Sequence, residues 1–141
     1  MAQQIHEVMT GIPVALERNQ SLVDAARMMR DAAIGDVLVT DNGHLVGVLT
    51  DRDIVVRCVA EARDPGMATA GECCSSDLVT ITPDDDVDKA VQLMRERAVR
   101  RIPVVEDGKA VGVISIGDLA IERDERSALA LTDISAAPPN D

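Results

Sequence analysis

The feature that most constrains this chain is an internal repeat: the sequence matches itself when it is shifted by about 65 residues. The register holds without a gap from Val14, which meets Val79, to Asp53, which meets Asp118. Identical pairs along it include Ala25/Ala90, Met29/Met94, Val39/Val104, Gly43/Gly108 and Gly47/Gly112. Each copy is too short to bury its apolar face well, so we expect the two copies to pack together about a pseudo-twofold axis.

Each copy has the pattern of strand, helix, strand, hairpin, strand and helix, which predicts an α/β (α+β) tandem repeat of β-α-β-β-α copies. Ser21 to Asp24 has the form of a capping box at the first helix, and Gly43 and Gly108 stand where tight hairpins need positive φ. The predicted strands cover 13–16, 37–39, 45–49, 79–82, 102–105 and 110–114. The predicted closing helices cover 51–62 and 116–125.

These elements predict two domains joined by a linker and followed by a tail. We expect the first domain at 8–62, the linker at 63–72, the second domain at 73–125 and a partly disordered tail at 126–141. The linker has the turn chemistry of Asp-Pro-Gly, and the tail ends in Ala-Ala-Pro-Pro-Asn-Asp.

Charge and composition argue against several function classes. The 141 residues include 14 Lys and Arg against 25 Asp and Glu, for a formal net charge of −11. Such an acidic surface repels phosphate backbones, which disfavours nucleic-acid binding. The chain has no Phe, Tyr or Trp, so base stacking on aromatic side chains and aromatic membrane anchors are excluded. No apolar run approaches the roughly 20 residues of a membrane span and no secretory signal is present, so we expect a cytoplasmic protein.

The spacing of potential metal ligands does not predict a metal site. No CxxC spacing exists, and the two histidines lie far from the three cysteines Cys58, Cys73 and Cys74. We therefore expect reduced thiols and no bound metal. The acidic run 84–86 has two interpretations, a cation site or a solvated cap at a helix start, and the helix dipole favours the cap.

Two segments have the residue types of a phosphate and sugar site. Thr50 stands three positions before Asp53, and Ser115 three positions before Asp118, each between a strand and a helix. The hydroxyl and the free N–H groups of the helix suit phosphate, and the acid can accept hydrogen bonds from ribose hydroxyls. The same spacing also makes a capping box that needs no ligand. The doubled occurrence favours a ligand site, and both roles can share one helix end.

With this order of motifs, the chain resembles a tandem pair of CBS domains from about residue 8 to 125. The resemblance is carried by the Ile-Pro-Val-Val strand at 102–105, the Asp-Gly hairpin and the Gly-x-x-Ser/Thr-x-x-Asp endings at 47–53 and 112–118. The segments 49–55 and 68–72 are similar to stand-alone pairs of the hypoxic response protein type. The resemblance implies a regulatory module with two clefts that bind AMP, ADP, ATP, S-adenosylmethionine or a related adenosyl ligand. It also implies a homodimer.

The resemblance further implies a role for each residue that matches the motif. The acid would hold the ribose, the hydroxyl and nearby basic residues would hold phosphate, and aliphatic residues would surround the adenine. The first cleft would use Thr50 and Asp53, lined by Val14, Val37 and Leu38. The second would use Ser115, Asp118, Arg100 and Arg101, lined by Val79, Ile102 and Pro103. The two arginines are replaced by Gly35 and Asp36 in the first copy, so we expect the second cleft to bind polyanions better. A solvated helix end is the alternative for the arginines.

No segment resembles an active centre. The sequence has no Ser/His/Asp set and no Gly-Lys-Ser phosphate loop, so we expect no enzymatic activity and no required cofactor. The function predicted is ligand sensing with an output to an unknown protein partner in trans. The alternative is a ligand-free interaction scaffold in which Thr50 and Ser115 serve only as caps.

Overall fold

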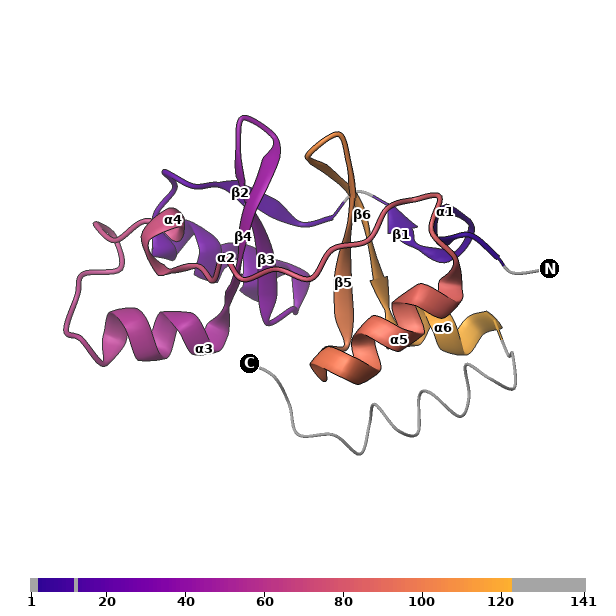
Figure 1. Cartoon of the computed structure of the whole chain (residues 1–141). Coiled ribbons are helices and arrows are strands. Elements are labelled where there is room, and N and C mark those ends of the chain that lie inside the picture. The colour runs from indigo at the N-terminus through magenta and orange to yellow at the C-terminus, as the bar shows by residue number, and fades with distance from the viewer. Residues whose placement is uncertain (1–2, 12, 123–141) are drawn as a thin grey trace. The chain divides into compact units, whose positions relative to one another are not determined.

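The computed structural model describes residues 3–11 and 13–122, which fall into two compact units. Unit 1 combines residues 3–11 with residues 79–122, and unit 2 spans residues 13–78. Each unit contains helices and a β-hairpin of one copy, so the predicted α/β tandem repeat is confirmed (Figure 1). The predicted tail at 126–141 lies outside the described residues.

Unit 2 is built on strand β3, which pairs in parallel with β2 and antiparallel with β4. Helix α2 begins after Ser21, whose hydroxyl accepts a hydrogen bond from the Asp24 N–H at 3.2 Å. The apolar face of α2 packs on the sheet through Leu22, Ala25 and Met29. The elements are β2 (Ala15–Glu17), α2 (Leu22–Ala32), β3 (Asp36–Asp41), β4 (His44–Thr50), α3 (Asp51–Ile54), the π-helix η1 (Val55–Val59) and α4 (Ala70–Cys73).

Unit 1 is built on strand β6, which is antiparallel to both β1 and β5 (Figure 1). Its core is aliphatic throughout, and its fully buried side chains include Ile5, Met94, Ile102, Ile114 and Leu119. The elements are α1 (Ile5–Val8), β1 (Thr10–Gly11), α5 (Val87–Arg97), β5 (Arg101–Glu106), β6 (Lys109–Ser115) and α6 (Ile116–Glu122). No helix in residues 3–11 and 13–122 is long and apolar enough to cross a membrane.

Both hairpins have the tight turn that the glycines predict. Asn42 and Gly43 have φ values of 52° and 85°, and Asp107 and Gly108 have 53° and 80°. Two successive residues of positive φ make a turn whose twist matches that of the flanking strands. The glycine predictions are therefore confirmed in both copies.

The strand predicted at 79–82 is wrong. Only Ile81 pairs there, through backbone hydrogen bonds with Pro103 and Val105. In the first copy, the Arg18 N–H extends the equivalent pairing by donating to the Thr40 carbonyl at 2.8 Å. The second copy has Pro83 at the position of Arg18, and proline has no N–H to donate. The strand is therefore reduced to a single bridge.

The closing helix of the first copy is shorter than the predicted 51–62. It continues from α3 into the π-helix and ends at Val59, where the Ala60 N–H donates to the Val55 carbonyl at 2.8 Å. Ala62 then adopts a φ of 56°, which directs the chain away from the helix. In the second copy α6 is described from Ile116 to Glu122, and the rest of the predicted helix lies outside the described residues.

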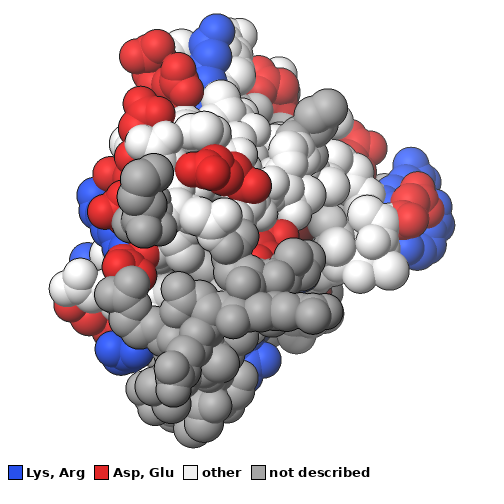
Figure 2. Space-filling view, turned by 90° about the vertical axis from the view of Figure 1, so that its right-hand side faces the viewer, with Lys and Arg blue, Asp and Glu red and all other residues white. Residues whose placement is uncertain are grey.

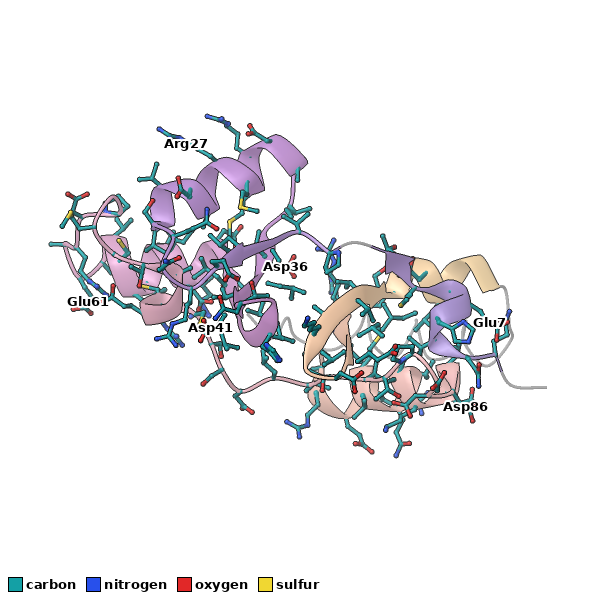
Figure 3. The ribbon with its side chains drawn as sticks, turned by 90° about the horizontal axis from the view of Figure 1, so that it is seen from above. Glu7, Arg27, Asp36, Asp41, Glu61 and Asp86 are labelled. Carbon is teal, nitrogen blue, oxygen red and sulfur yellow. The ribbon has the colours of Figure 1, made fainter. Side chains whose placement is uncertain are left out.

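The sequence patterns did not predict two short helices, α1 and α4, which occupy equivalent positions in the repeat. Helix α1 precedes the first copy but packs in unit 1, which contains the second copy, and Ile5 is buried there. Helix α4 lies between the copies and packs in unit 2, which contains the first copy, and Ala70 and Cys73 are buried there. The segments that carry them, residues 3–11 and 70–75, are here called the N-terminal strap and the middle strap. Figure 3 labels Glu7 on the N-terminal strap and Asp86 on the segment beside it. Neither copy therefore completes its core from its own residues.

Glycines allow the straps to approach the sheets. A Cβ on Gly112 would lie 2.6 Å from the Met9 sulfur and 2.8 Å from the Thr10 carbonyl oxygen. A Cβ on Gly47, the equivalent position, would lie 2.5 Å from the Cys74 sulfur. These distances are shorter than van der Waals contact, so a larger residue at either position must displace a strap.

The substitution Gly112→Ala is expected to destabilise unit 1 by about 1–3 kcal/mol, because the added methyl group overpacks the contact with the N-terminal strap. The control is Gly11→Ala in the paired strand, where an added Cβ meets nothing within 4 Å. We expect the control to change stability by less than about 0.5 kcal/mol. Urea denaturation followed by far-UV circular dichroism measures both, and equal effects would contradict the role of Gly112.

Candidate functional site

The second site consists of Ser115, at the end of β6, and Asp118, in the first turn of α6. Asp118 Oδ2 accepts hydrogen bonds from the Ser115 N–H at 2.8 Å and from its hydroxyl at 3.1 Å. The Asp118 N–H donates in return to Ser115 Oγ at 3.2 Å. The other carboxylate oxygen, Oδ1, accepts a hydrogen bond from the Thr10 hydroxyl at 3.2 Å. The acid is thus joined both to its own strand end and to the N-terminal strap.

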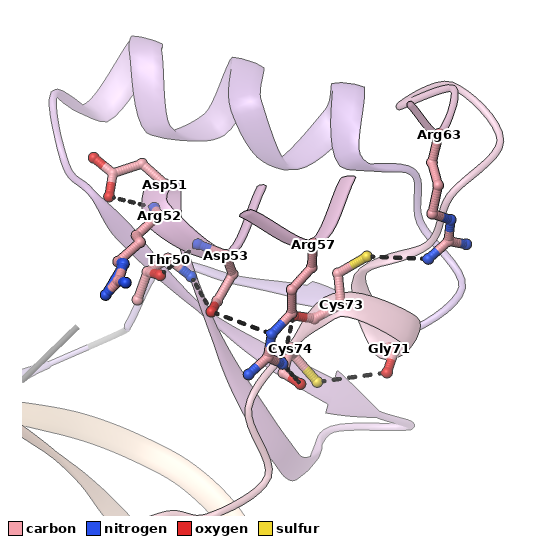
Figure 4. A network of polar contacts seen from close by, with 9 residues as sticks. All are labelled: Thr50, Asp51, Arg52, Asp53, Arg57, Arg63, Gly71, Cys73 and Cys74. Carbon is pink, nitrogen blue, oxygen red and sulfur yellow. Dashed lines mark hydrogen bonds and ion pairs between the residues drawn. The ribbon is translucent and has the colours of Figure 1, made fainter. Parts of the chain in front are cut away.

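The first site, Thr50 and Asp53, has the same geometry (Figure 4). Asp53 Oδ2 accepts from the Thr50 N–H at 2.9 Å, and the Asp53 N–H donates to Thr50 Oγ1 at 3.0 Å. Asp53 Oδ1 lies 3.8 Å from Arg57 Nε. The Asp53 side chain is only 13% exposed, so it lies in a partly desolvated position.

The capping interpretation therefore describes both sites as they stand. In each site Oδ2 of the acid closes a reciprocal box with the hydroxyl residue, which stabilises the start of the helix. In each site Oδ1 contacts a side chain outside the box. The capping boxes thus leave one carboxylate oxygen of each acid for other chemistry.

The two sites differ in the charges beside the hydroxyl residue. Across the hairpin, Ser115 pairs with Arg101, whereas Thr50 pairs with Asp36. The Arg100 carbonyl accepts from the Ile116 N–H at 3.1 Å, which places the Arg100 backbone at the start of α6. Arg100 and Arg101 are both exposed. The structure thus places the backbones of the two predicted arginines beside the second site.

The first site has an acidic setting instead. Gly35 is equivalent to Arg100, and a Cβ on Gly35 would lie 3.1 Å from Asp51 Oδ2. Asp36 lies opposite Thr50 across the hairpin, and Asp51 follows Thr50 in the chain. These two residues add two carboxylates to that of Asp53 beside this site. Figure 2 shows acidic side chains scattered among uncharged ones over one face of the molecule. The negative charge near the first site therefore matches the general character of the chain.

The structure divides the predicted aliphatic lining into two groups. Val37 and Ile102 belong to the hydrophobic cores and are 2% and 0% exposed. Leu38 and Pro103, the next residues in the strands, are buried on the opposite face because side chains alternate. The two remaining residues of the predicted lining are more accessible: Val14 is 37% exposed, and Val79 is half-buried. Of this set, Val14 and Val79 are the most accessible.

Sequence reasoning missed Thr10 and Arg57, which contact the site acids. Arg57 is four residues after Asp53, a helical spacing at which an ion pair can form. Thr10 is far from Asp118 in sequence, but its equivalent in the repeat, Ser75, is also a hydroxyl residue. The register of the repeat, extended towards the N-terminus, pairs these two hydroxyl residues but does not show that Thr10 contacts Asp118.

Cys73 and Cys74 lie beside the first site in a network held by two arginines (Figure 4). Arg57 Nη1 donates to the carbonyl oxygens of Cys73 and Cys74 at 3.1 and 3.0 Å. Arg63 Nη1 lies 3.6 Å from the Cys73 sulfur, and its Nη2 donates to Glu72 at 2.8 Å. Burial is the largest influence on the pKa of the Cys73 and Cys74 thiols and raises both pKa values. The thiols are therefore weak nucleophiles at neutral pH.

The acidic run 84–86 lies at the start of α5. Asp85 Oδ2 accepts from the Thr82 N–H at 2.8 Å and lies 3.3 Å from Lys89 Nζ. Asp86 is the N-cap residue, but its side chain makes no capping hydrogen bond. Instead the Val87 N–H donates to the Gln3 carbonyl of the N-terminal strap. Within the described ranges, no group of three or more His, Cys, Asp or Glu side chains is placed to hold a metal ion.

These features define a pair of small α/β domains with matched hydroxyl–acid sites. The CBS domain family model matches residues 5–59 and 70–124, so this chain belongs to the CBS domain family as a tandem pair. The resemblance to CBS pairs of the hypoxic response type is thereby confirmed.

Two curated relatives match nearly the whole chain. It is 36% identical over 133 residues to the CBS domain-containing protein YhcV of Bacillus subtilis, covering 93% of this chain and 94% of the relative. It is 29% identical over 133 residues to hypoxic response protein 1 of Mycobacterium tuberculosis, covering 94% of this chain and 93% of the relative.

Two solved structures share the fold. Hypoxic response protein I, solved with two coordinated zinc ions, has a TM-score of 0.78 and 30% identity, covering 85% of this chain and 98% of that one. The CBS domain pair of MJ0100, solved with 5′-methylthioadenosine and S-adenosylmethionine, has a TM-score of 0.73, covering 87% of this chain and 97% of that one. Its identity of 23% shows the fold alone.

The cysteines are expected to react slowly in the native protein. Burial raises the pKa values of the Cys73 and Cys74 thiols and keeps Cys58 out of contact with solvent, so Ellman's reagent should label the native protein far more slowly than free cysteine. In denaturant, all three should react at once. Rapid labelling of Cys73 in the native protein, located by mass spectrometry, would contradict this expectation.

Proposed function

We propose that this protein is a regulatory ligand-sensing module that binds an adenine nucleotide or related adenosyl ligand and signals to a protein partner in trans. The observation that carries the proposal is the doubled site. Both copies have a hydroxyl residue and an acid at the same junction of strand and helix, with one carboxylate oxygen outside the capping box.

Each part of the site suits one part of an adenosyl ligand. The carboxylates of Asp53 and Asp118 can accept hydrogen bonds from the ribose hydroxyls. The exposed arginines Arg100 and Arg101 can pair with phosphates. Val14 and Val79 can contact the adenine ring, and Leu38 and Pro103 are the buried members of the predicted lining that lie outside the two cores. The adenosyl ligands of the MJ0100 pair are of the same chemical class.

The second site is proposed as the better site for polyanions. Arg101 stands opposite its hydroxyl residue, where the first site has Asp36. A carboxylate beside a triphosphate raises the free energy of the complex, and a guanidinium lowers it. The first site is better suited to a ligand with little negative charge, such as S-adenosylmethionine.

The proposed mechanism is a population shift in which the ligand favours one packing of the strand ends and helix starts that it contacts. We also propose a homodimer as the working form. The closing helix of the first copy exposes Val55, Val56 and Val59 by 57%, 46% and 61%, an apolar face that a second copy could cover. A related CBS-CP12 protein is described as hexameric, so members of this fold form oligomers.

The competing proposal is a ligand-free interaction scaffold, and the completed capping boxes are the observation that favours it. The ligand-sensing proposal allows the purified protein to retain a bound purine, whereas the scaffold proposal predicts that it retains none. Because the chain has neither Trp nor Tyr, a retained purine would dominate its absorbance near 260 nm.

Calorimetric titration with ATP and with adenosine tests the site assignments. Asp118→Asn keeps an oxygen for capping but removes the charge, and it should weaken ATP binding about tenfold. Asp53→Asn should have a smaller effect on ATP. Arg100→Ala should weaken ATP binding about fivefold and leave adenosine binding unchanged, because adenosine has no phosphate.

The matched control is Arg27→Ala, which removes an exposed arginine of α2 that points outward from unit 2 (Figure 3). It should leave both affinities unchanged. Two equal ATP sites, or loss of binding in Asp53→Asn with none in Asp118→Asn, would refute the ranking of the sites. If no adenosyl ligand binds or raises the melting temperature, the scaffold proposal is correct.

A further inference from the structure

The two site acids share a connection that capping does not explain. The Oδ1 atom of Asp118 accepts its hydrogen bond from Thr10, which lies on the N-terminal strap. The Oδ1 atom of Asp53 faces Arg57, whose guanidinium also donates to the carbonyl oxygens of Cys73 and Cys74 on the middle strap. The same carboxylate oxygen is therefore linked to the equivalent strap in both units, once directly and once through an arginine.

The N-terminal strap is held elsewhere by backbone hydrogen bonds, by Ile5 in the core, and by Val8 and Met9, which are partly buried against that core. In the N-terminal strap, Ile5 is buried in the core, and its N–H donates to the Asp85 carbonyl at 2.9 Å. Thr10 and Gly11 pair with Val113 and Gly112 of β6. The strap thus has a firm anchor at Ile5 and a short two-residue pairing near the site. Strands this short contribute little stability alone.

The hydrogen bonds of Asp118 set a limit on ligand binding. Oδ2 already accepts two hydrogen bonds from Ser115, which matches the two lone pairs of a carboxylate oxygen. Oδ1 accepts one from Thr10, so one lone pair remains among the contacts of the described residues. A ribose with two adjacent hydroxyls needs two acceptor positions to bind through both. Release of Thr10 from Oδ1 supplies the second and, unlike release of the Ser115 hydroxyl, leaves the capping box intact.

We propose that Thr10 is a latch that couples occupancy of the second site to docking of the N-terminal strap. This inference rests on the proposed function and adds its regulation. Without ligand, the Thr10 hydroxyl holds Asp118 Oδ1 and keeps the end of the strap on β6. A ribose diol replaces Thr10 on Asp118, so binding loosens residues 9–11 while Ile5 stays anchored. The loosened strap is the surface that changes on ligand binding.

The test compares Thr10→Val with the wild type by titration with ATP. Valine keeps the shape of threonine but cannot donate a hydrogen bond, so the ribose no longer competes for Oδ1. We expect ATP to bind about fivefold more tightly to this variant. Thr10→Ser keeps the hydroxyl and should retain the wild-type affinity. Thr80→Val, at an exposed threonine of the same unit, is the control and should also retain it.

Hydrogen–deuterium exchange supplies the second measurement. In the wild type, ATP should speed exchange in the peptide that covers residues 3–11, and Thr10→Val should already show faster exchange without ATP. Equal or weaker ATP binding by Thr10→Val, or slower exchange of this peptide on ATP binding, would overturn the latch while leaving the proposed function intact. Failure of the wild type to bind ATP would overturn the latch together with the proposal of ATP binding.

Discussion

The structure depends on one packing constraint: neither copy of the repeat supplies all of its own core. Ile5 fills the core of the second copy, and Ala70 with Cys73 fills that of the first. Copies of this size bury too little apolar surface alone, and here no aromatic side chain enlarges the core. The short helices therefore act as parts of the other copy. Gly47 and Gly112 make this possible, because a side chain at either position would displace the strap above it.

This exchange also determines the surroundings of the candidate sites. The straps pair antiparallel with β4 and β6, and Thr10 of the N-terminal strap contacts the acid that follows β6. The capping boxes hold one oxygen of each acid, and the other is linked to a strap, directly through Thr10 at Asp118 and through Arg57 at Asp53. The carboxylates of Asp53 and Asp118 are therefore both candidate ligand-binding groups and part of the contacts that hold the straps. A ligand that engages these acids would alter contacts that also help to hold the straps.

The two copies keep the same backbone but have diverged in charge. Asp36 and Arg101 occupy equivalent positions opposite the hydroxyl residues, and Gly35 replaces Arg100. The chain has a net charge of −11, so a pair of arginines gives the second site a local positive charge on an otherwise acidic protein. Divergence of this kind suits a module that distinguishes ligands by their phosphate content. It also explains why a doubled fold need not have two equal sites.

The repeat register could be predicted because the two halves of the sequence match directly. The hairpin glycines and the hydroxyl–acid pairs could be predicted because turn chemistry and capping are decided by neighbours within a few residues. The loss of a strand at 79–82 was missed although its cause, Pro83, is visible in the sequence. Only the tertiary structure decided which copy each strap completes and which group contacts each acid. Thr10 reaches Asp118 because the chain folds back over Gly112, and no local pattern encodes a contact between residues so far apart in sequence.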